Sequence, residues 1–169
     1  GYPWFGYRAR DQFISLPGAT LYAEKERAFD EIMERAVVAL REFMNGEAAT
    51  TRLKEVDAPD VLLWAIWAIQ QYAAKNGAEV AANKYGQLVF DIVNYIRRQQ
   101  HPNLAVHDNG LLFTNGKERP ATWMNAVENG WPITPRTGYV VEINALWYNA
   151  LKFAAELATA QKNENQADL

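Results

Sequence analysis

The first residues whose types and spacing could do chemistry are Arg10-Asp11, which follow the aromatic residues Trp4 and Tyr7. Such a group can hold a sugar, because an aromatic face stacks on the C–H groups of the ring while the carboxylate and the guanidinium hydrogen-bond its hydroxyls. The same residues also fit a surface salt bridge next to aromatic residues of the core. The spacing alone leaves both interpretations open.

A second group of candidates lies in residues 114–138, a stretch without helical or strand periodicity. It contains Trp123, Asn125, Trp131 and Arg136. A loop of this length inside a compact domain is usually functional or disordered, and its tryptophans argue against disorder. It is either the wall of a pocket or a structural loop pinned by buried tryptophans.

Carboxylates at helix starts form a third group. Glu142 lies at the start of an apolar helical pattern, where it either orients a ligand or caps its own helix. Asp57 and Asp60 are interpreted first as helix-start residues of the same kind. Ser15 has no histidine or acid at an informative spacing, so a catalytic triad is not expected. No glycine-rich phosphate loop is present.

Composition excludes several classes of function. The chain has 169 residues, which corresponds to one domain, and its net charge of −3 makes nucleic-acid and membrane partners unexpected. It has no cysteine and only two histidines, His101 and His107, so neither a metal site nor a cofactor is expected. No apolar stretch is long enough for a transmembrane helix, and no targeting segment is visible, so a cytoplasmic location is expected. The 6 Trp, 8 Tyr and 7 Phe suit a site that stacks ring-shaped ligands.

The elements that must position these residues are mostly helical. Apolar residues at steps of three and four predict helices over 22–44, 60–75, 79–99 and 139–161, with a short helical piece inside residues 1–20. The helix over 60–75 is apolar on every face, which is typical of a helix buried on all sides. The Asn109-Gly110 pair between short apolar runs predicts one β-hairpin. The order of elements indicates stacked helical hairpins, followed by a polar tail over 162–169.

Five segments, taken in order, resemble the sequence signature of glycogen debranching enzymes. The residues Trp4-Phe5, Arg10-Asp11 and Phe13-Ile14-Ser15-Leu16-Pro17-Gly18 resemble the family's WF…WGRDT-ISLPG. The later matches are Asp57-Ala58 with Leu63-Trp64, Asp108-Asn109-Gly110-Leu111-Leu112, Thr122-Trp123-Met124-Asn125-Ala126, and Thr134-Pro135-Arg136 with Val141-Glu142-Ile143-Asn144-Ala145-Leu146-Trp147-Tyr148-Asn149-Ala150-Leu151. Each match is weak alone, but five in family order are specific.

The resemblance implies the amylo-α-1,6-glucosidase domain, a six-hairpin glycosidase similar to the glucoamylase clan. The expected fold is all-α, a partial (α/α)6 barrel (toroid) with one small β-hairpin, in which residues 1–161 form a fragment of the barrel. The implied activity is inverting hydrolysis of the α-1,6-linked glucose at a glycogen or starch branch. Inversion needs an acid and a base roughly 6.5–9.5 Å apart.

The resemblance also implies the site residues. The family's general acid falls at Asn125, whose amide has no proton to give at neutral pH. The general base is expected further towards the C-terminus than this chain extends. Arg10 and Asp11 are expected to hold glucose hydroxyls, and the rest of the substrate-binding set is Trp4, Asp57, Trp123, Arg136 and Glu142. The opening motif departs from the family pattern at Tyr7, Arg8 and Gln12.

Three classes of function therefore stand side by side. The leading one is part of an α-1,6-glucosidase, with the fragment itself inactive and an α-glucan as partner. The alternative is a non-catalytic α-glucan-binding pseudo-enzyme that has lost its general acid, and the third is a helical interaction module without glucan affinity. A partial barrel is also expected to self-associate, because it would uncover helices such as the one over 60–75.

Overall fold

The structure, a computed structural model, describes residue 4 and residues 6–167, with side chains as far as residue 161. Phe5 of the Trp4-Phe5 motif lies outside the described residues, as do residues 1–3, 168 and 169. Within the described part the chain is mostly helical, as expected for the all-α class. The helices are α1 (Ala9–Ala19), α2 (Glu26–Asn45), α3 (Val61–Asn76), α4 (Ala78–Arg97) and α5 (Val141–Ala167).

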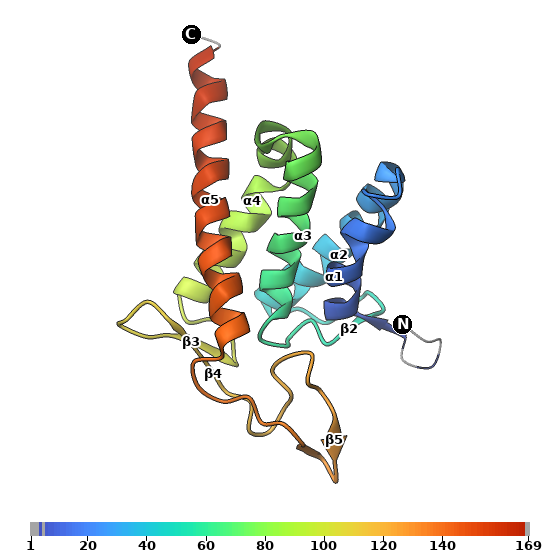
Figure 1. The fold of residues 1–169 in the computed structure, drawn as a ribbon, viewed down its shortest axis with the longest axis vertical. Coiled ribbons are helices and arrows are strands. Elements are labelled where there is room, and N and C mark those ends of the chain that lie inside the picture. Colours follow the sequence, from blue (N-terminus) through green and yellow to red (C-terminus); the bar gives the residue numbers. More distant parts are fainter. Residues whose placement is uncertain (1–3, 5, 168–169) are drawn as a thin grey trace.

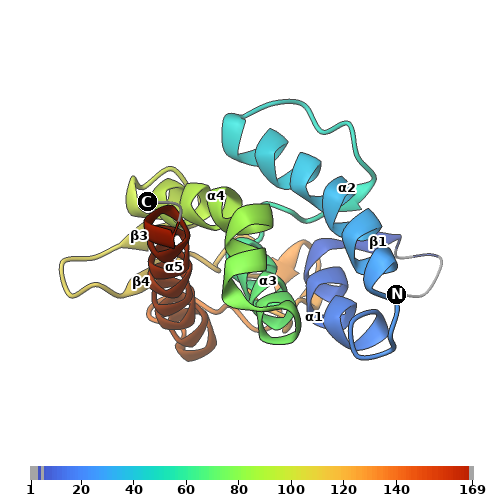
Figure 2. The same ribbon diagram turned by 90° about the horizontal axis from the view of Figure 1, so that it is seen from above.

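The helices form two rows. Figure 2 shows α1, α3 and α5 side by side in one row, with α2 and α4 lying against it as a second row. Successive helices run in opposite directions, so α1, α3 and α5 all begin at the same end of the molecule (Figure 1). The turns at the far end are short: residues 20–25 join α1 to α2, and Gly77 joins α3 to α4. The stacked helical hairpins predicted from the sequence are therefore present.

The core lies around α3, whose apolar residues face α1, α4 and α5. Val61, Leu62, Ile66 and Ile69 have no solvent exposure. Phe29 of α2 closes the core from the second row, with its ring stacked on Tyr72 at 5.3 Å between centroids. The interpretation of this helix as a buried one is confirmed. The expectation that it would lie uncovered is wrong, because neighbouring helices of the same chain already pack around it.

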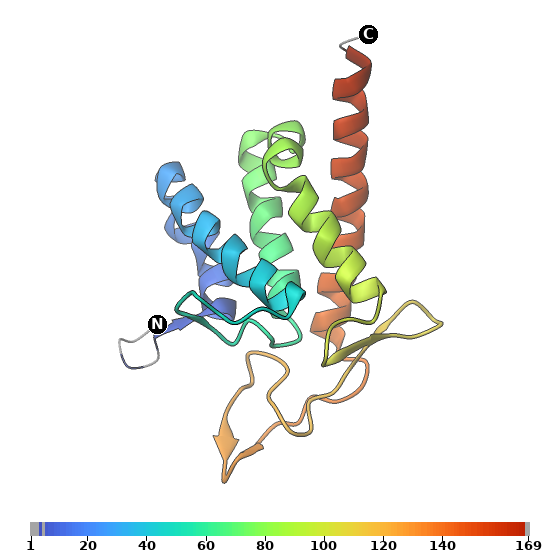
Figure 3. The same cartoon turned by 180° about the vertical axis from the view of Figure 1, so that it is seen from behind.

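The long connections and all the strands lie at the end where α1, α3 and α5 begin (Figure 3). Strand β1 (Tyr7–Arg8) pairs in parallel with β2 (Leu53–Lys54). Strands β3 (Leu104–Val106) and β4 (Leu112–Thr114) form the predicted antiparallel hairpin. Asn144 of α5 fixes this hairpin by bonding both the N–H and the carbonyl of Leu112, at 2.8 and 3.0 Å.

Two features differ from the expectation. A second hairpin, β5 (Val127–Glu128) and β6 (Trp131–Pro132), lies inside the segment expected to be a loop. Its turn residues Asn129 and Gly130 both have positive φ, 50° and 87°, as a tight two-residue hairpin turn requires. Helix α5 also continues to Ala167, through most of the expected polar tail.

Candidate functional site

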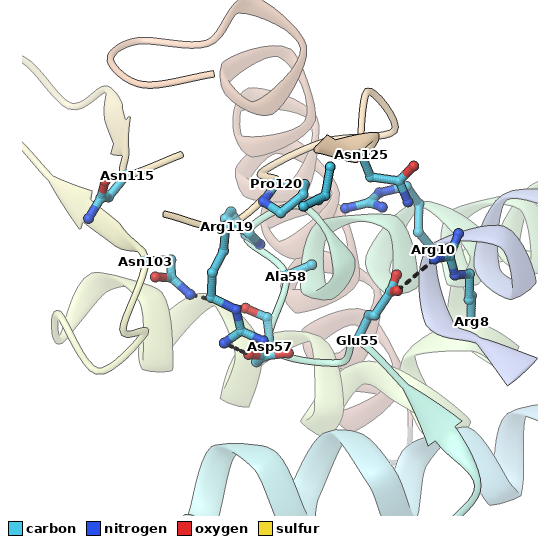
Figure 4. Close-up of a pocket in the computed structure, with 12 residues that line it drawn as sticks. Arg8, Arg10, Glu55, Asp57, Ala58, Asn103, Asn115, Arg119, Pro120 and Asn125 are labelled. Carbon is cyan, nitrogen blue, oxygen red and sulfur yellow. Dashed lines mark hydrogen bonds and ion pairs between the residues drawn. The ribbon is translucent and has the colours of Figure 1, made fainter. Parts of the chain in front are cut away.

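A polar hollow of ≈ 200 Å³ lies at the end of the molecule where α1 and α3 begin. Figure 4 shows that its walls come from β1, the segment before α3, and the loop between β4 and β5. Three of the residues selected from the sequence line it, namely Arg10, Asp57 and Asn125. The other lining residues are Arg8, Glu55, Ala58, Pro59, Asn103, Asn115, Arg119, Pro120 and Val127.

Arg10 forms a buried ion pair across the start of two helices. Its Nε and Nη2 donate to the two carboxylate oxygens of Asp60 at 2.7 and 2.8 Å. Arg10 is 3% exposed and Asp60 2%. The indole N–H of Trp64 donates to the same carboxylate at 3.2 Å. Because both groups are desolvated and bidentate, this pair fixes the start of α1 against the start of α3.

Asp11, the expected partner of Arg10, lies on the exposed face of α1. Its backbone carbonyl accepts a hydrogen bond from the Ser15 hydroxyl at 2.7 Å. The arginine of the motif therefore pairs with an aspartate fifty residues later in the chain, and the neighbouring aspartate does not line the hollow. The surface Arg-Asp salt bridge weighed as the other interpretation is also absent here, because the pair that forms is buried.

Two further ion pairs form opposite sides of the hollow. Arg8 contacts Glu55 at 3.1 Å, and Arg119 contacts Asp57 at 2.5 Å. Glu55 has a positive φ of 61°, a backbone conformation that costs free energy for a residue other than glycine. Asn103 donates from its amide to the backbone carbonyl of Asp57 at 3.4 Å. Both carboxylates in the hollow are thus engaged by arginines.

The loop that carries Asn125 is held from both sides. Thr122 is fully buried, and its Oγ1 accepts from the backbone N–H of Met124 at 3.3 Å. Arg136 donates to the sulfur of Met124 at 3.3 Å and also pairs with Glu142 at the start of α5. This chain of contacts ties the loop to α5. Arg136 and Glu142 bind each other and do not line the hollow.

The tryptophans selected from the sequence lie outside the hollow. Trp4 is 73% exposed and Trp123 64%. Trp131 on β6 is exposed as well, so the interpretation of the loop as pinned by buried tryptophans does not hold for Trp123 and Trp131. The exposed rings of Trp123 and Trp131 can stack on a ligand, and both lie on the loop and hairpin that also carry Asn125 and Val127 of the hollow.

A buried histidine supports the floor of the site. The Nδ1 of His101 accepts from the backbone N–H of Asn103 at 3.1 Å, so its proton lies on Nε2, which has no partner among the described residues. Burial lowers the pKa of His101 to about 4, and the charge of Asp57 opposes that shift. His101 is therefore neutral at physiological pH and positions Asn103.

Besides Arg10, which is bound to Asp60, the hollow is lined by groups of the kinds that hydrogen-bond hydroxyls: three amides, two guanidiniums and two carboxylates. Sequence reasoning missed Arg8, Glu55, Asn103, Asn115 and Arg119. Arg8 lies in the two-residue strand β1, and the other four lie in segments between elements, so hydrophobic periodicity carries no information on any of them. One signal was available. Successive helices are antiparallel, so every second connection lies at the same end of the molecule, and those connections are rich in polar residues.

The described part of the chain holds no cluster of three or more His, Asp or Glu residues that could bind a metal ion. Among the described residues, no helix combines the length and the apolar character needed to cross a membrane.

A mostly helical domain with a hollow lined by amides, guanidiniums and carboxylates at its loop end agrees with the family indicated by the five sequence motifs. The family model described as amylo-alpha-1,6-glucosidase matches residues 1–168. The chain belongs to this family, and the family implies a glycosidase domain similar to that of glycogen debranching enzymes. No curated protein and no solved structure matches the chain.

Proposed function

We propose that this chain forms the glucan-binding part of an α-1,6-glucosidase-type domain, in which the two helix rows belong to an (α/α)6 barrel. The observation that carries the proposal is the meeting of Arg10, Asp57 and Asn125, from three separate family motifs, at one polar hollow. The hollow is of a size for one sugar ring. Its amides and charged groups provide the paired donors and acceptors that adjacent sugar hydroxyls need.

Exposed aromatic rings near the hollow support an oligosaccharide as the ligand. Val127 of β5 lines the hollow, and the same hairpin carries the exposed Trp131 on β6. Trp123 lies two residues before Asn125 and is exposed too. Large exposed aromatic side chains mark binding surfaces, and their faces stack on the C–H groups of pyranose rings. A glucan held in the hollow would extend over them.

We further propose that the chain alone does not hydrolyse the glucan. Hydrolysis with inversion needs one group that protonates the leaving oxygen and another that activates water. Asn125 occupies the family's acid position, and an amide cannot donate a proton in this way. Glu142 is bound by Arg136, and Glu128 lies on the exposed β5–β6 hairpin, so neither faces the hollow.

The second candidate function is that of a non-catalytic glucan-binding protein, and Asn125 favours it too. Asn125→Asp in any longer protein that contains this chain separates the two. If the family's base is present there, the aspartate raises glucose release, which would show that position 125 is the acid position and that Asn125 leaves it without a proton donor. If glucose release stays absent with an intact glucan affinity, the protein is a binder.

Binding is tested by calorimetric titration of the chain with maltooligosaccharides. We expect weak binding with a dissociation constant on the order of 1 mM, and Asp57→Asn together with Asn103→Ala should weaken it by ~10-fold, the effect of about 1.4 kcal/mol. Asp108→Asn, on the exposed β3–β4 turn, is the control and should leave affinity unchanged. An absence of binding by the unmutated chain, or an equal loss in the control, would refute the proposal.

A further inference from the structure

A second hollow, of ≈ 420 Å³, lies outside the candidate site, between α1, α2 and the β1–β2 pair. Figure 2 shows α1 and α2 side by side with β1 at their end. The hollow is lined by Tyr7, Gln12, Ile32, Arg35, Ala36, Thr51, Arg52 and Leu53. No function discussed so far uses it.

The charge of this hollow is unusual for an acidic protein. Arg35 and Arg52 both line it, and its lining contains no aspartate or glutamate. Among the described residues, neither arginine has an acidic partner, whereas Arg8, Arg41 and Arg119 each pair with a carboxylate. Two guanidiniums that share a hollow without a counter-charge repel each other, and an anion between them removes the repulsion.

The remaining polar groups of the hollow are donors as well. Gln12 offers an amide, and Tyr7 offers a phenolic hydroxyl on a ring that is largely exposed. The Thr51 oxygen accepts from the N–H of Leu53 at 3.4 Å, which leaves its own proton available. Guanidinium forks with added hydroxyl and amide donors match the oxygens of a phosphoryl group, and an exposed aromatic face suits a sugar ring.

We propose that this hollow is a second binding site, which takes the phosphate monoester of a small sugar. Arg35 and Arg52 bind the phosphoryl oxygens, and the Tyr7 ring contacts the sugar. Tyr7 and Gln12 are two of the positions at which the opening motif departs from the family pattern. At these two positions the lining of the hollow does not follow from the family resemblance.

The second site is separate from the glucan hollow, with strand β1 between them. Tyr7 and Arg8 are successive residues of β1, so their side chains point to opposite faces. Tyr7 lines the second hollow, while Arg8 lines the first and pairs with Glu55. Both ligands can bind at once, and the proposal does not depend on glucan binding.

The test is a calorimetric titration of the full chain, at low salt, with glucose 6-phosphate, inorganic phosphate and glucose. We expect glucose 6-phosphate to bind more tightly than inorganic phosphate, and glucose not to bind at this site. Arg35→Gln and Arg52→Gln should each lower the affinity for glucose 6-phosphate by ~10-fold, because a hydrogen bond to a charged group contributes about 1.5–3 kcal/mol. Both arginines are exposed, so these variants are expected to fold.

The matched controls each remove one charge elsewhere. Arg97→Gln and Arg98→Gln, made singly at the exposed end of α4, should each change the affinity less than twofold. An equal loss in these controls would show a non-specific charge effect and overturn the proposal, as would an absence of phosphate-ester binding by the unmutated chain. Equal affinity for inorganic phosphate and glucose 6-phosphate would overturn the role of Tyr7 and the sugar.

Discussion

In the function proposed here, Asn125 limits the chemistry that the polar hollow can perform. Its amide donates from nitrogen and accepts at oxygen, so it can bind a glycosidic oxygen or a hydroxyl but not protonate either. The arginines around it have different tasks. Arg8 and Arg119 engage the carboxylates that face the hollow, whereas Arg10 is buried against Asp60. We therefore assign Arg10 a structural role beneath the site.

Removing one partner of the buried Arg10–Asp60 pair should destabilise the fold strongly. Asp60→Asn leaves a buried guanidinium without its counter-charge, and we expect the free energy of unfolding to fall by about 3–5 kcal/mol. Urea denaturation measures it. Glu31→Gln, which breaks the exposed Arg27–Glu31 pair, is the control and should cost at most ~0.5 kcal/mol. A loss below ~1 kcal/mol for Asp60→Asn would contradict the view that the Arg10–Asp60 ion pair is buried and desolvated.

His101 should make stability depend on pH. Burial lowers its pKa from 6.5 to about 4, so between these values the unfolded chain binds a proton that the folded chain excludes. Stability from this group is complete above pH 6.5 and falls as the pH drops towards 4, by roughly 3 kcal/mol at most. His101→Gln should flatten urea-derived stability over this range. A wild-type slope in His101→Gln would count against this account.

The sequence predicted which residue types meet at the site better than it predicted their partners. Arg10 and Asp11 are adjacent, so their pairing was the simplest hypothesis. The true partner, Asp60, lies at the start of α3 and becomes close only when α1 packs on that helix. Local spacing carries no information on such a contact.

At the scale of elements, the segment between β4 and α5 determines where Asn125 lies. Thr114 and Gly138 form an isolated antiparallel bridge, and the backbone N–H of Gly116 donates to the Thr137 hydroxyl at 3.0 Å. Together with the Arg136–Glu142 pair, these contacts hold both ends of the segment on α5. The loop has little regular structure, yet it is positioned by specific bonds.

Gly116 is where this segment is tightest. A Cβ at this position would lie against the backbone carbonyl of Arg136, well inside van der Waals contact. Gly116→Ala should therefore lower the free energy of unfolding by about 1–3 kcal/mol and weaken glucan binding. Gly18→Ala is the matched control, because nothing surrounds Gly18 and alanine favours a helix, so a gain of about 0.5–1 kcal/mol is expected. If urea denaturation gives the same change in the free energy of unfolding for both variants, the close contact between Gly116 and the Arg136 backbone is refuted.

Elements with a strong period were predictable and short ones were not. The helices from α2 to α5 follow apolar repeats, and the β3–β4 hairpin follows Asn109-Gly110. The β5–β6 hairpin carries the same signal in Asn129-Gly130, but its strands have only two residues each and therefore show no alternation. The parallel β1–β2 pair depends on segments more than forty residues apart. No local sequence pattern indicates such a contact.

At the scale of the whole molecule, the two rows leave one edge of α5 exposed. Val141 is 77% exposed and Tyr148 68%, and Leu151 lies on the same side of the helix. These residues form an exposed apolar strip along α5. The buried α3 contributes nothing to this surface.

We expect the chain to self-associate through this edge of α5, because exposed apolar patches usually find a partner. Multi-angle light scattering should show a dimer or larger species at high concentration. Tyr148→Glu should shift the population to monomer, whereas Val80→Glu, an exposed apolar residue on α4, should not. A monomer at all concentrations would contradict self-association through the exposed apolar residues of α5.

The central claim is that the hollow around Asn125 holds an α-glucan and does not cleave it. An NMR titration with a 6-α-glucosyl maltooligosaccharide tests binding and cleavage in the same sample. Chemical-shift changes of the protein amides report binding, and the anomeric signals report free glucose. We predict shifts for Asn103, Asn115 and Asn125, with no glucose released by the wild type or by Asn125→Asp alone. Glucose released by the unmutated chain at ordinary rates, or shifts that bypass these three amides, would contradict the account.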